Sequence, residues 1–223
     1  MIPLRDSVRS RTFPIMNLAL IIINFLVFFK EISLSNQALN QLTFTYGLIP
    51  ARVTAQLSSG ASLLALATPF ITAMFLHGNW LHIIGNMLYL WIFGDNVEDR
   101  VGHLPYLFFY FVVGVSGSIA HILSNPASRV PIIGASGAIA GILGAYFISF
   151  PRAKVLTLLP LFFFITLVEI PAVWFLLLWF VIQLLSGFAT SVAADSVAWW
   201  AHIGGFLVGA VLINLFATRI QAN

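Results

Sequence analysis

Residues 134–141 read GASGAIAG, and they place one serine, Ser136, between glycines in a long uncharged stretch of chain. A lone serine in a glycine-rich membrane segment most often serves helix packing. Ser136 becomes chemically interesting only if another part of the chain brings a base to it.

The composition indicates that lipid surrounds most of the chain. Of the 223 residues, 60% are hydrophobic and 8% are charged, and the mean hydropathy is +1.00. Soluble domains carry about 25% charged residues, so we expect an all-α membrane protein with one membrane domain over residues 1–223. The net charge of +3 comes from few residues, which argues for orientation in a bilayer and against a nucleic-acid partner. The lack of cysteine excludes disulfides, thiolate catalysis and cysteine metal ligands.

Apolar runs of membrane-spanning length recur along the chain, because a helix needs roughly 20 apolar residues to cross a bilayer. We predict six spans, at residues 13–29, 70–93, 104–123, 134–150, 171–185 and 199–217. Residues 30–69 are too interrupted to span and too apolar for a solvated loop, which predicts short helices at the interface. The charge cluster at 94–100 is expected to be a solvated helix end, and residues 156–169 a hydrophobic connecting loop. No small-residue cleavage pattern follows the first span, which favours a retained helix over a signal peptide.

The distribution of basic residues predicts the orientation of the chain. Six spans put both termini on one side, and placing them in the cytoplasm leaves seven basic residues inside and three outside, as the positive-inside rule requires. The inside set is Arg5, Arg9, Arg11, Arg100, Arg152, Lys154 and Arg219, and the outside set is Lys30, Arg52 and Arg129. We therefore expect a multi-pass protein with cytoplasmic termini.

This topology brings polar residues of three spans to a similar depth. His77, His82 and Asn86 lie in the outer part of the second span, Ser136 near the outer end of the fourth, and His202 in the first turns of the sixth. Polar side chains within a membrane are costly and tend to face a bundle interior or a water-filled cavity. Their convergence predicts a functional site below the outer surface.

Small residues on the fourth and sixth spans would let these two helices approach closely. The fourth carries Gly137, Gly141 and Gly144, and the sixth carries Ala201, Gly205 and Gly209. Such stripes permit close backbone packing, which Ser136 and His202 need because both side chains are short. Gly134 would permit an unusual backbone turn before the serine.

Serine becomes a nucleophile when a neighbouring base takes its proton, and His202 is the candidate base. The oxyanion of a tetrahedral intermediate needs donors, for which Asn86, His82 and the backbone N–H of Ser136 are candidates. Asp195 lies in a loop seven residues before His202, so we expect a dyad and not a triad. Gln183 is expected to serve helix packing, and Glu169 to position the start of the fifth span.

Three blocks of sequence resemble the rhomboid intramembrane serine proteases. Residues 77–86, HGNWLHIIGN, resemble the family's HxxxxHxxxN segment; residues 134–137, GASG, resemble its GxSG motif; and residues 201–209, AHIGGFLVG, resemble its AHxxGxxxG block. Order and spacing match over about 70–212. The GxSG motif alone is weakly specific, but the three blocks together are highly specific. Ala140 stands where some members have a tyrosine that stacks on the histidine.

The resemblance implies a six-helix rhomboid-like bundle in a prokaryotic cell membrane. Its hydrophobic first loop would project sideways in the interface, and its fifth span would be a mobile side gate. The resemblance implies Ser136 as nucleophile and His202 as general base. It also implies His82 and Asn86 as oxyanion donors and His77 as a supporting residue.

The predicted function is an intramembrane serine endopeptidase without a cofactor. It would cleave single-span membrane proteins near the outer end of their helix, at small or polar residues that weaken the helix. Two alternatives are a catalytically silent relative that binds membrane helices, which the intact Ser136–His202 pair disfavours, and a small transporter. The transporter would need polar residues through the whole bilayer depth. A metal site at His77, His82 and His202 is disfavoured, because the first two are five residues apart, not four with a glutamate between them.

Overall fold

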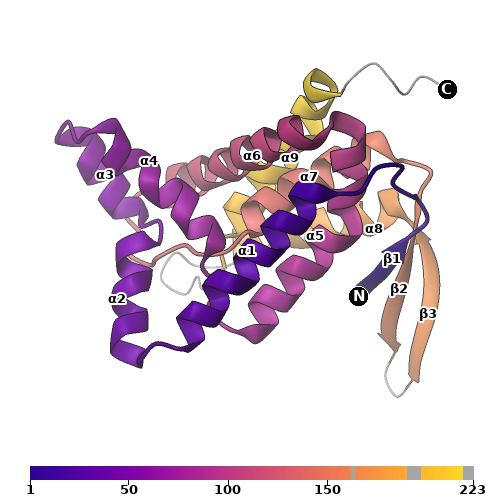
Figure 1. Cartoon of the computed structure of the whole chain (residues 1–223), viewed down its shortest axis with the longest axis horizontal. Helices are drawn as coiled ribbons and strands as arrows, with labels where there is room; N and C mark the ends of the chain where they lie inside the picture. The colour runs from indigo at the N-terminus through magenta and orange to yellow at the C-terminus, as the bar shows by residue number, and fades with distance from the viewer. Residues whose placement is uncertain (162–163, 190–196, 218–223) are drawn as a thin grey trace.

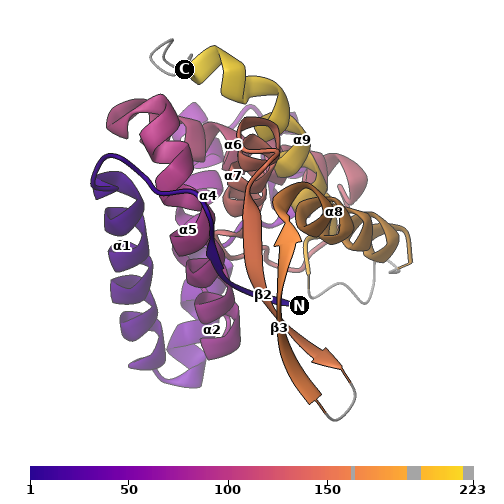
Figure 2. The same cartoon turned by 90° about the vertical axis from the view of Figure 1, so that its right-hand side faces the viewer.

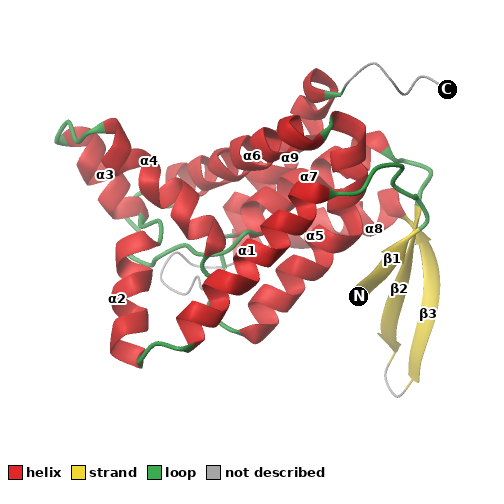
Figure 3. Ribbon diagram, in the orientation of Figure 1, coloured by secondary structure: helices red, strands yellow, loops and turns green. Residues whose placement is uncertain are grey.

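A computed structural model describes residues 1–161, 164–189 and 197–217, and most of them are helical (Figure 3). In chain order the elements are β1 (Ile2–Asp6), α1 (Ile15–Ile32), α2 (Asn36–Tyr46), α3 (Pro50–Ser58), α4 (Leu63–Thr72), the 3₁₀ turn η1 (Ala73–Phe75), α5 (Trp80–Val101), α6 (His103–Ser124), α7 (Ser136–Ser149), β2 (Lys154–Leu161), β3 (Phe164–Pro171), α8 (Ala172–Ala189) and α9 (Trp199–Phe216).

The apolar helices agree with a membrane protein. Among the described residues, α1, α6, α8 and α9 are each long and apolar enough to cross a bilayer. The pair formed by residues 63–75 and α5 also passes this test but is bent by 91°, and α7 is a shorter apolar helix. The predicted helical membrane fold is confirmed, while the number of six spans stays a prediction.

Helix α7 lies at the centre of the bundle. It packs against α5, α6, α8 and α9, and every residue from Ala138 to Tyr146 is buried. Its small residues suit this position because neighbouring helices surround it on several sides (Figures 1 and 2). Ser136, the first residue of α7, is thereby held at the end of the most enclosed helix.

The glycine stripes of α7 and α9 lie directly against each other. A Cβ added at Gly205 would lie 2.1 Å from the backbone oxygen of Gly137, and one added at Gly209 would lie 2.0 Å from that of Gly141. Because real Cβ atoms do not approach backbone oxygens this closely, any larger residue there would push the two helices apart.

The predicted second span, residues 70–93, is wrong at both ends. The chain turns at residues 76–79, and α5 begins at Trp80, where the Asn79 side chain caps it by accepting the His82 N–H at 2.9 Å. At its other end α5 continues through the charge cluster to Val101.

The charge cluster is a buried junction, which corrects the prediction of a solvated helix end. Glu98 is fully buried, and its carboxylate accepts the backbone N–H groups of Met16 at 3.0 Å and Asn17 at 2.7 Å. These two groups belong to the first turn of α1, where backbone donors lack intrahelical partners and an anion is favourable. Asp99 likewise accepts the backbone N–H of Thr12 at 2.9 Å. The cluster therefore joins α5 to the start of α1.

Between α1 and α5 the chain forms the three short helices α2, α3 and α4, which lie at one side of the bundle (Figure 1). Short helices were predicted for this segment. Their position at a membrane interface stays a prediction.

A three-stranded antiparallel sheet, with the order β1–β2–β3, lies at the opposite end of the bundle (Figure 1). It replaces the hydrophobic loop predicted for residues 156–169. Leu158 pairs with Leu167 in the β2–β3 hairpin, and Lys154 Nζ lies 3.2 Å from Glu169 Oε2 at its base. The hairpin escaped prediction because both of its faces are apolar, so the alternation that indicates a half-buried strand is missing.

The environment of the Asp6 carboxyl group on β1 should make the stability of the protein depend on pH. Its carboxylate accepts hydrogen bonds from the Asn96 amide at 2.9 Å and from the Tyr146 hydroxyl. Burial, assisted by the charge of Asp95 and opposed by the Tyr146 hydrogen bond, raises the pKa of Asp6 from 3.8 to about 6. The folded state then binds more protons than the unfolded state between pH 3.8 and about 6, so the Asp6 contribution to stability falls as the pH rises through this window.

Replacement of Asp6 by asparagine should remove this contribution. We expect unfolding in detergent micelles to show a smaller loss of stability from pH 4 to pH 7 in Asp6→Asn than in the wild type. Identical pH slopes in the two proteins would contradict the assignment.

Candidate active site

The backbone before α7 brings Ser136 to its position. Gly134 has a φ of +117°, and its N–H donates to the Ala73 carbonyl at 2.8 Å. A Cβ at Gly134 would lie 2.6 Å from His82 Nε2. Both the left-handed backbone and this contact require glycine, and the turn lets α7 begin at Ser136.

His202 lies in the first turns of α9 and faces Ser136. Its Nε2 is 2.8 Å from Ser136 Oγ, and its Nδ1 is 2.8 Å from Oε1 of Gln183 on α8. The histidine is 8% exposed. Its ring therefore connects α9 with a side chain of α7 and a side chain of α8. The glycine contacts between α7 and α9 explain how the short side chains of Ser136 and His202 meet.

Aromatic rings flank this histidine. The ring centroids of Trp179 on α8 and Trp199 on α9 lie 6.0 and 6.1 Å from that of His202. At position 140, where some rhomboids have a stacking tyrosine, the chain has the buried Ala140, so the tryptophans of α8 and α9 pack near the ring instead.

The other predicted residues lie on and before α5, next to the turn that precedes Ser136. Asn86 Nδ2 would be 3.5 Å from a Cβ at Gly134, and it lies 3.0 Å from His77 Nε2. The His77 backbone N–H donates to both carboxylate oxygens of the buried Glu31, at 3.1 and 3.2 Å. His77 thus connects Asn86 to the end of α1, while the His82 ring packs against it with centroids 5.0 Å apart.

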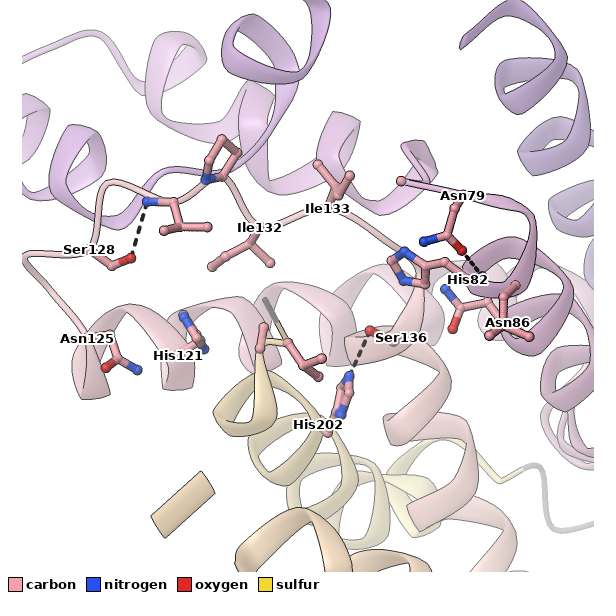
Figure 4. A pocket seen from close by; sticks show the side chains of 16 residues that line it. Asn79, His82, Asn86, His121, Asn125, Ser128, Ile132, Ile133, Ser136 and His202 are labelled. Carbon is pink, nitrogen blue, oxygen red and sulfur yellow. Dashed lines mark hydrogen bonds between the residues drawn. The ribbon is translucent and has the colours of Figure 1, made fainter. Parts of the chain in front are cut away.

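A cavity of about 590 Å³ opens at these side chains (Figure 4). Ser136, His202, His82 and Asn86 all line it, whereas His77 does not. The structure therefore brings the predicted residues of three helices to one site. Asp195, which we considered as an orienting acid, lies outside the described residues.

The cavity continues along α6, on which no functional residue was predicted. His121 and Asn125 line it there, and Figure 4 shows them on the same helix away from Ser136. Their spacing of four residues, which puts both on one face of a helix, was the signal that could have identified them. Gln183 carried no comparable signal, because its partner His202 lies on another helix.

Comparisons with known proteins identify the family of the chain. Residues 65–219 match the family model of the Rhomboid domain. Over 161 residues the chain is 30% identical to "Rhomboid-like protein 11, chloroplastic" of Arabidopsis thaliana, a match that covers 69% of this chain and 54% of that protein. Over 149 residues it is 31% identical to "Rhomboid protein 1, mitochondrial" of Saccharomyces cerevisiae, which covers 62% and 39%.

A shorter match, 41% identical over 75 residues, is to "Rhomboid protease GluP" of Bacillus subtilis and covers 34% of this chain and 14% of that protein. The chain spans about half or less of the length of these relatives. They include plastid, mitochondrial and bacterial proteins, so the expected prokaryotic cell membrane gains no support from them. The family model, in contrast, covers most of the chain, and it does so over the helices that hold the site. The chain belongs to the rhomboid family and is an integral membrane protein.

Proposed function

We propose that this protein is an intramembrane serine endopeptidase that cleaves membrane-spanning substrates. The observation that carries the proposal is the 2.8 Å contact between Ser136 Oγ and His202 Nε2 at the edge of a cavity among apolar helices. A serine and a histidine within hydrogen-bonding reach are the arrangement that activates a serine hydroxyl.

In this mechanism His202 Nε2 accepts the proton of Ser136 while Oγ attacks the scissile carbonyl. The same histidine then protonates the leaving amine, and the acyl-enzyme is hydrolysed by water. Negative charge that develops on the carbonyl oxygen would meet the side chains of Asn86 and His82 and the backbone N–H of Ser136. Since Ser136 is the first residue of α7, that N–H belongs to the helix turn whose donors lack intrahelical partners.

The depth of the site sets the substrate class. We propose six spans in one membrane domain with both termini cytoplasmic, so that Ser136 and His202 lie near the outer ends of their helices. A substrate helix shields its own carbonyls by hydrogen bonding. Cleavage would therefore occur in single-span proteins near the outer end of the helix, where small or polar residues weaken it.

The test uses the full chain reconstituted in liposomes with a single-span substrate and, in a parallel sample, with a fluorophosphonate probe. We expect substrate cleavage, and we expect the probe to label Ser136, as located by mass spectrometry of the labelled protein. A protein that binds the substrate without cleaving it and resists the probe would instead be a silent relative. Labelling of a different serine would overturn the assignment of Ser136.

Asn86 provides a separate prediction for the oxyanion site. Asn86→Ala should lower kcat by about 100- to 1000-fold, the usual effect of removing one oxyanion donor, with a much smaller change in KM. Asn40→Ala is the matched control, because Asn40 is exposed on α2 and should leave kcat unchanged. Equal kcat values for the two variants would exclude Asn86 as a donor.

A further inference from the structure

Gln183 is a polar side chain on a helix that otherwise offers mainly apolar groups to lipid. In α8 only 22% of the span is buried, against 33–44% in α1, α6 and α9, yet Gln183 itself is 5% exposed. It shares the buried face of α8 with Ala172, Phe175 and Leu176. A polar group within a membrane is costly unless it finds a partner, and the partner here is His202.

Two hydrogen bonds determine the orientation of the Gln183 amide. Its Nε2 donates to the Trp179 carbonyl of the same helix at 3.2 Å, and its Oε1 lies 2.8 Å from His202 Nδ1. The amide nitrogen can only donate and the amide oxygen can only accept. The carbonyl of Trp179 therefore selects the nitrogen, which leaves the oxygen facing the histidine.

This orientation determines the tautomer of the histidine. Because Oε1 accepts, His202 Nδ1 must carry the hydrogen. A neutral imidazole has one N–H, so Nε2 keeps its lone pair, and that lone pair faces Ser136 Oγ at 2.8 Å.

We propose that Gln183 is a positioning residue for His202: its amide oxygen holds the imidazole in the Nδ1–H tautomer, with Nε2 directed at Ser136. The proposal rests on the proposed peptidase function. Gln183 exchanges no proton. When Nε2 takes the serine proton, the imidazolium still donates from Nδ1 to the same oxygen, so the ring stays in place until Nε2 passes the proton to the leaving amine. The amide thus has the orienting part that a carboxylate has in a catalytic triad.

The kinetic test compares substitutions at position 183 in liposomes with the single-span substrate. Gln183→Leu has a similar size but no acceptor. We expect its kcat to fall by about 10- to 100-fold, the range found when a hydrogen-bond partner that orients a metal-ligating histidine is removed, with KM nearly unchanged. Gln183→Glu keeps an acceptor oxygen at the same reach and should recover most of kcat. Ile182→Leu is the matched control, because Ile182 is 45% exposed on the neighbouring lipid-facing side of α8, and it should behave as the wild type.

A spectroscopic readout separates positioning from packing. In protein labelled with ¹⁵N-histidine, the His202 resonances, identified by their absence in His202→Ala, should report the Nδ1–H tautomer in the wild type and in Gln183→Glu. Gln183→Leu should show a mixture of tautomers. If the leucine variant does not fold, Gln183→Met, which is unbranched like glutamine, replaces it.

The outcomes distinguish this proposal from the proposed function. Wild-type kcat and a single tautomer in Gln183→Leu would overturn the positioning role, and so would a folded Gln183→Glu as inactive as the leucine variant. The peptidase assignment survives either result as long as Ser136→Ala is inactive. Activity that does not depend on Ser136 would remove both proposals together.

Discussion

Ser136→Ala is expected to lower kcat for a reconstituted single-span substrate by at least about a thousandfold, and His202→Ala by a similar factor. Alanine at position 136 would remove the proposed nucleophile, and alanine at position 202 would leave the serine hydroxyl without its proposed base. In serine proteases, removal of either residue of such a catalytic unit abolishes nearly all of the activity that the unit provides. The double variant should therefore be scarcely less active than either single one.

The measurement is the initial rate of substrate cleavage at equal amounts of folded protein, with fluorophosphonate labelling in parallel. Ser116→Ala is the matched control, because this serine lies on α6 and its hydroxyl donates to the Val112 carbonyl of its own helix at 2.8 Å. Its rate should equal that of the wild type. Additive losses in the double variant would show that Ser136 and His202 act separately and would contradict the proposed dyad.

Much of the fold could be predicted because its determinants are local. The helices α1, α6, α8 and α9 were predicted within a few residues of their ends, since each is one apolar run of about the length that a bilayer requires. Ser136, His202, His82 and Asn86 line one cavity. They were grouped from the sequence because the predicted six-span topology puts the outer ends of alternate spans at a similar depth. The close approach of Ser136 and His202 was predicted from the small residues on the fourth and sixth spans, which are α7 and α9 in the structure.

The parts that could not be predicted depend on partners far away in the sequence. Glu98 lies in a charged segment that normally indicates a solvated helix end, but its carboxylate caps the start of α1, 81 residues away from it at Asn17. Gln183 was predicted to serve helix packing because it lies on an apolar helix, and only the structure shows its contact with His202. In both cases a polar side chain became interpretable only through a contact between helices, and no periodicity in the sequence reports such a contact.

The second large effect is expected at the contact between α7 and α9. Gly209→Leu should yield no folded, active protein, because even a Cβ at this position would lie 2.0 Å from the Gly141 backbone oxygen, 2.6 Å from its carbonyl carbon and 2.7 Å from its Cα. Backbone atoms cannot rotate away as the end of a flexible side chain can. The two helices would have to separate along the interface that also holds Ser136 against His202.

Gly209→Ala tests the same contact with the smallest possible side chain. We expect a stability loss of about 1–3 kcal/mol from overpacking and a fall in kcat of about 100-fold, because a displacement of about 1 Å in a catalytic arrangement costs this much. A shift of this size would lengthen the 2.8 Å contact between Ser136 and His202 beyond hydrogen-bonding distance. The measurements are thermal unfolding in micelles and cleavage rates in liposomes.

Gly85→Ala is the matched control on α5, where an added Cβ would meet nothing within 4 Å. This variant should be as stable as the wild type or slightly more stable, since alanine is a better helix former than glycine by about 1 kcal/mol, and its activity should be unchanged. If Gly209→Ala were as stable and as active as Gly85→Ala, the α7–α9 contact would have to be looser than the structure has it. The glycines around Ser136 would then be generic membrane packing and not the feature that brings a serine and a histidine together.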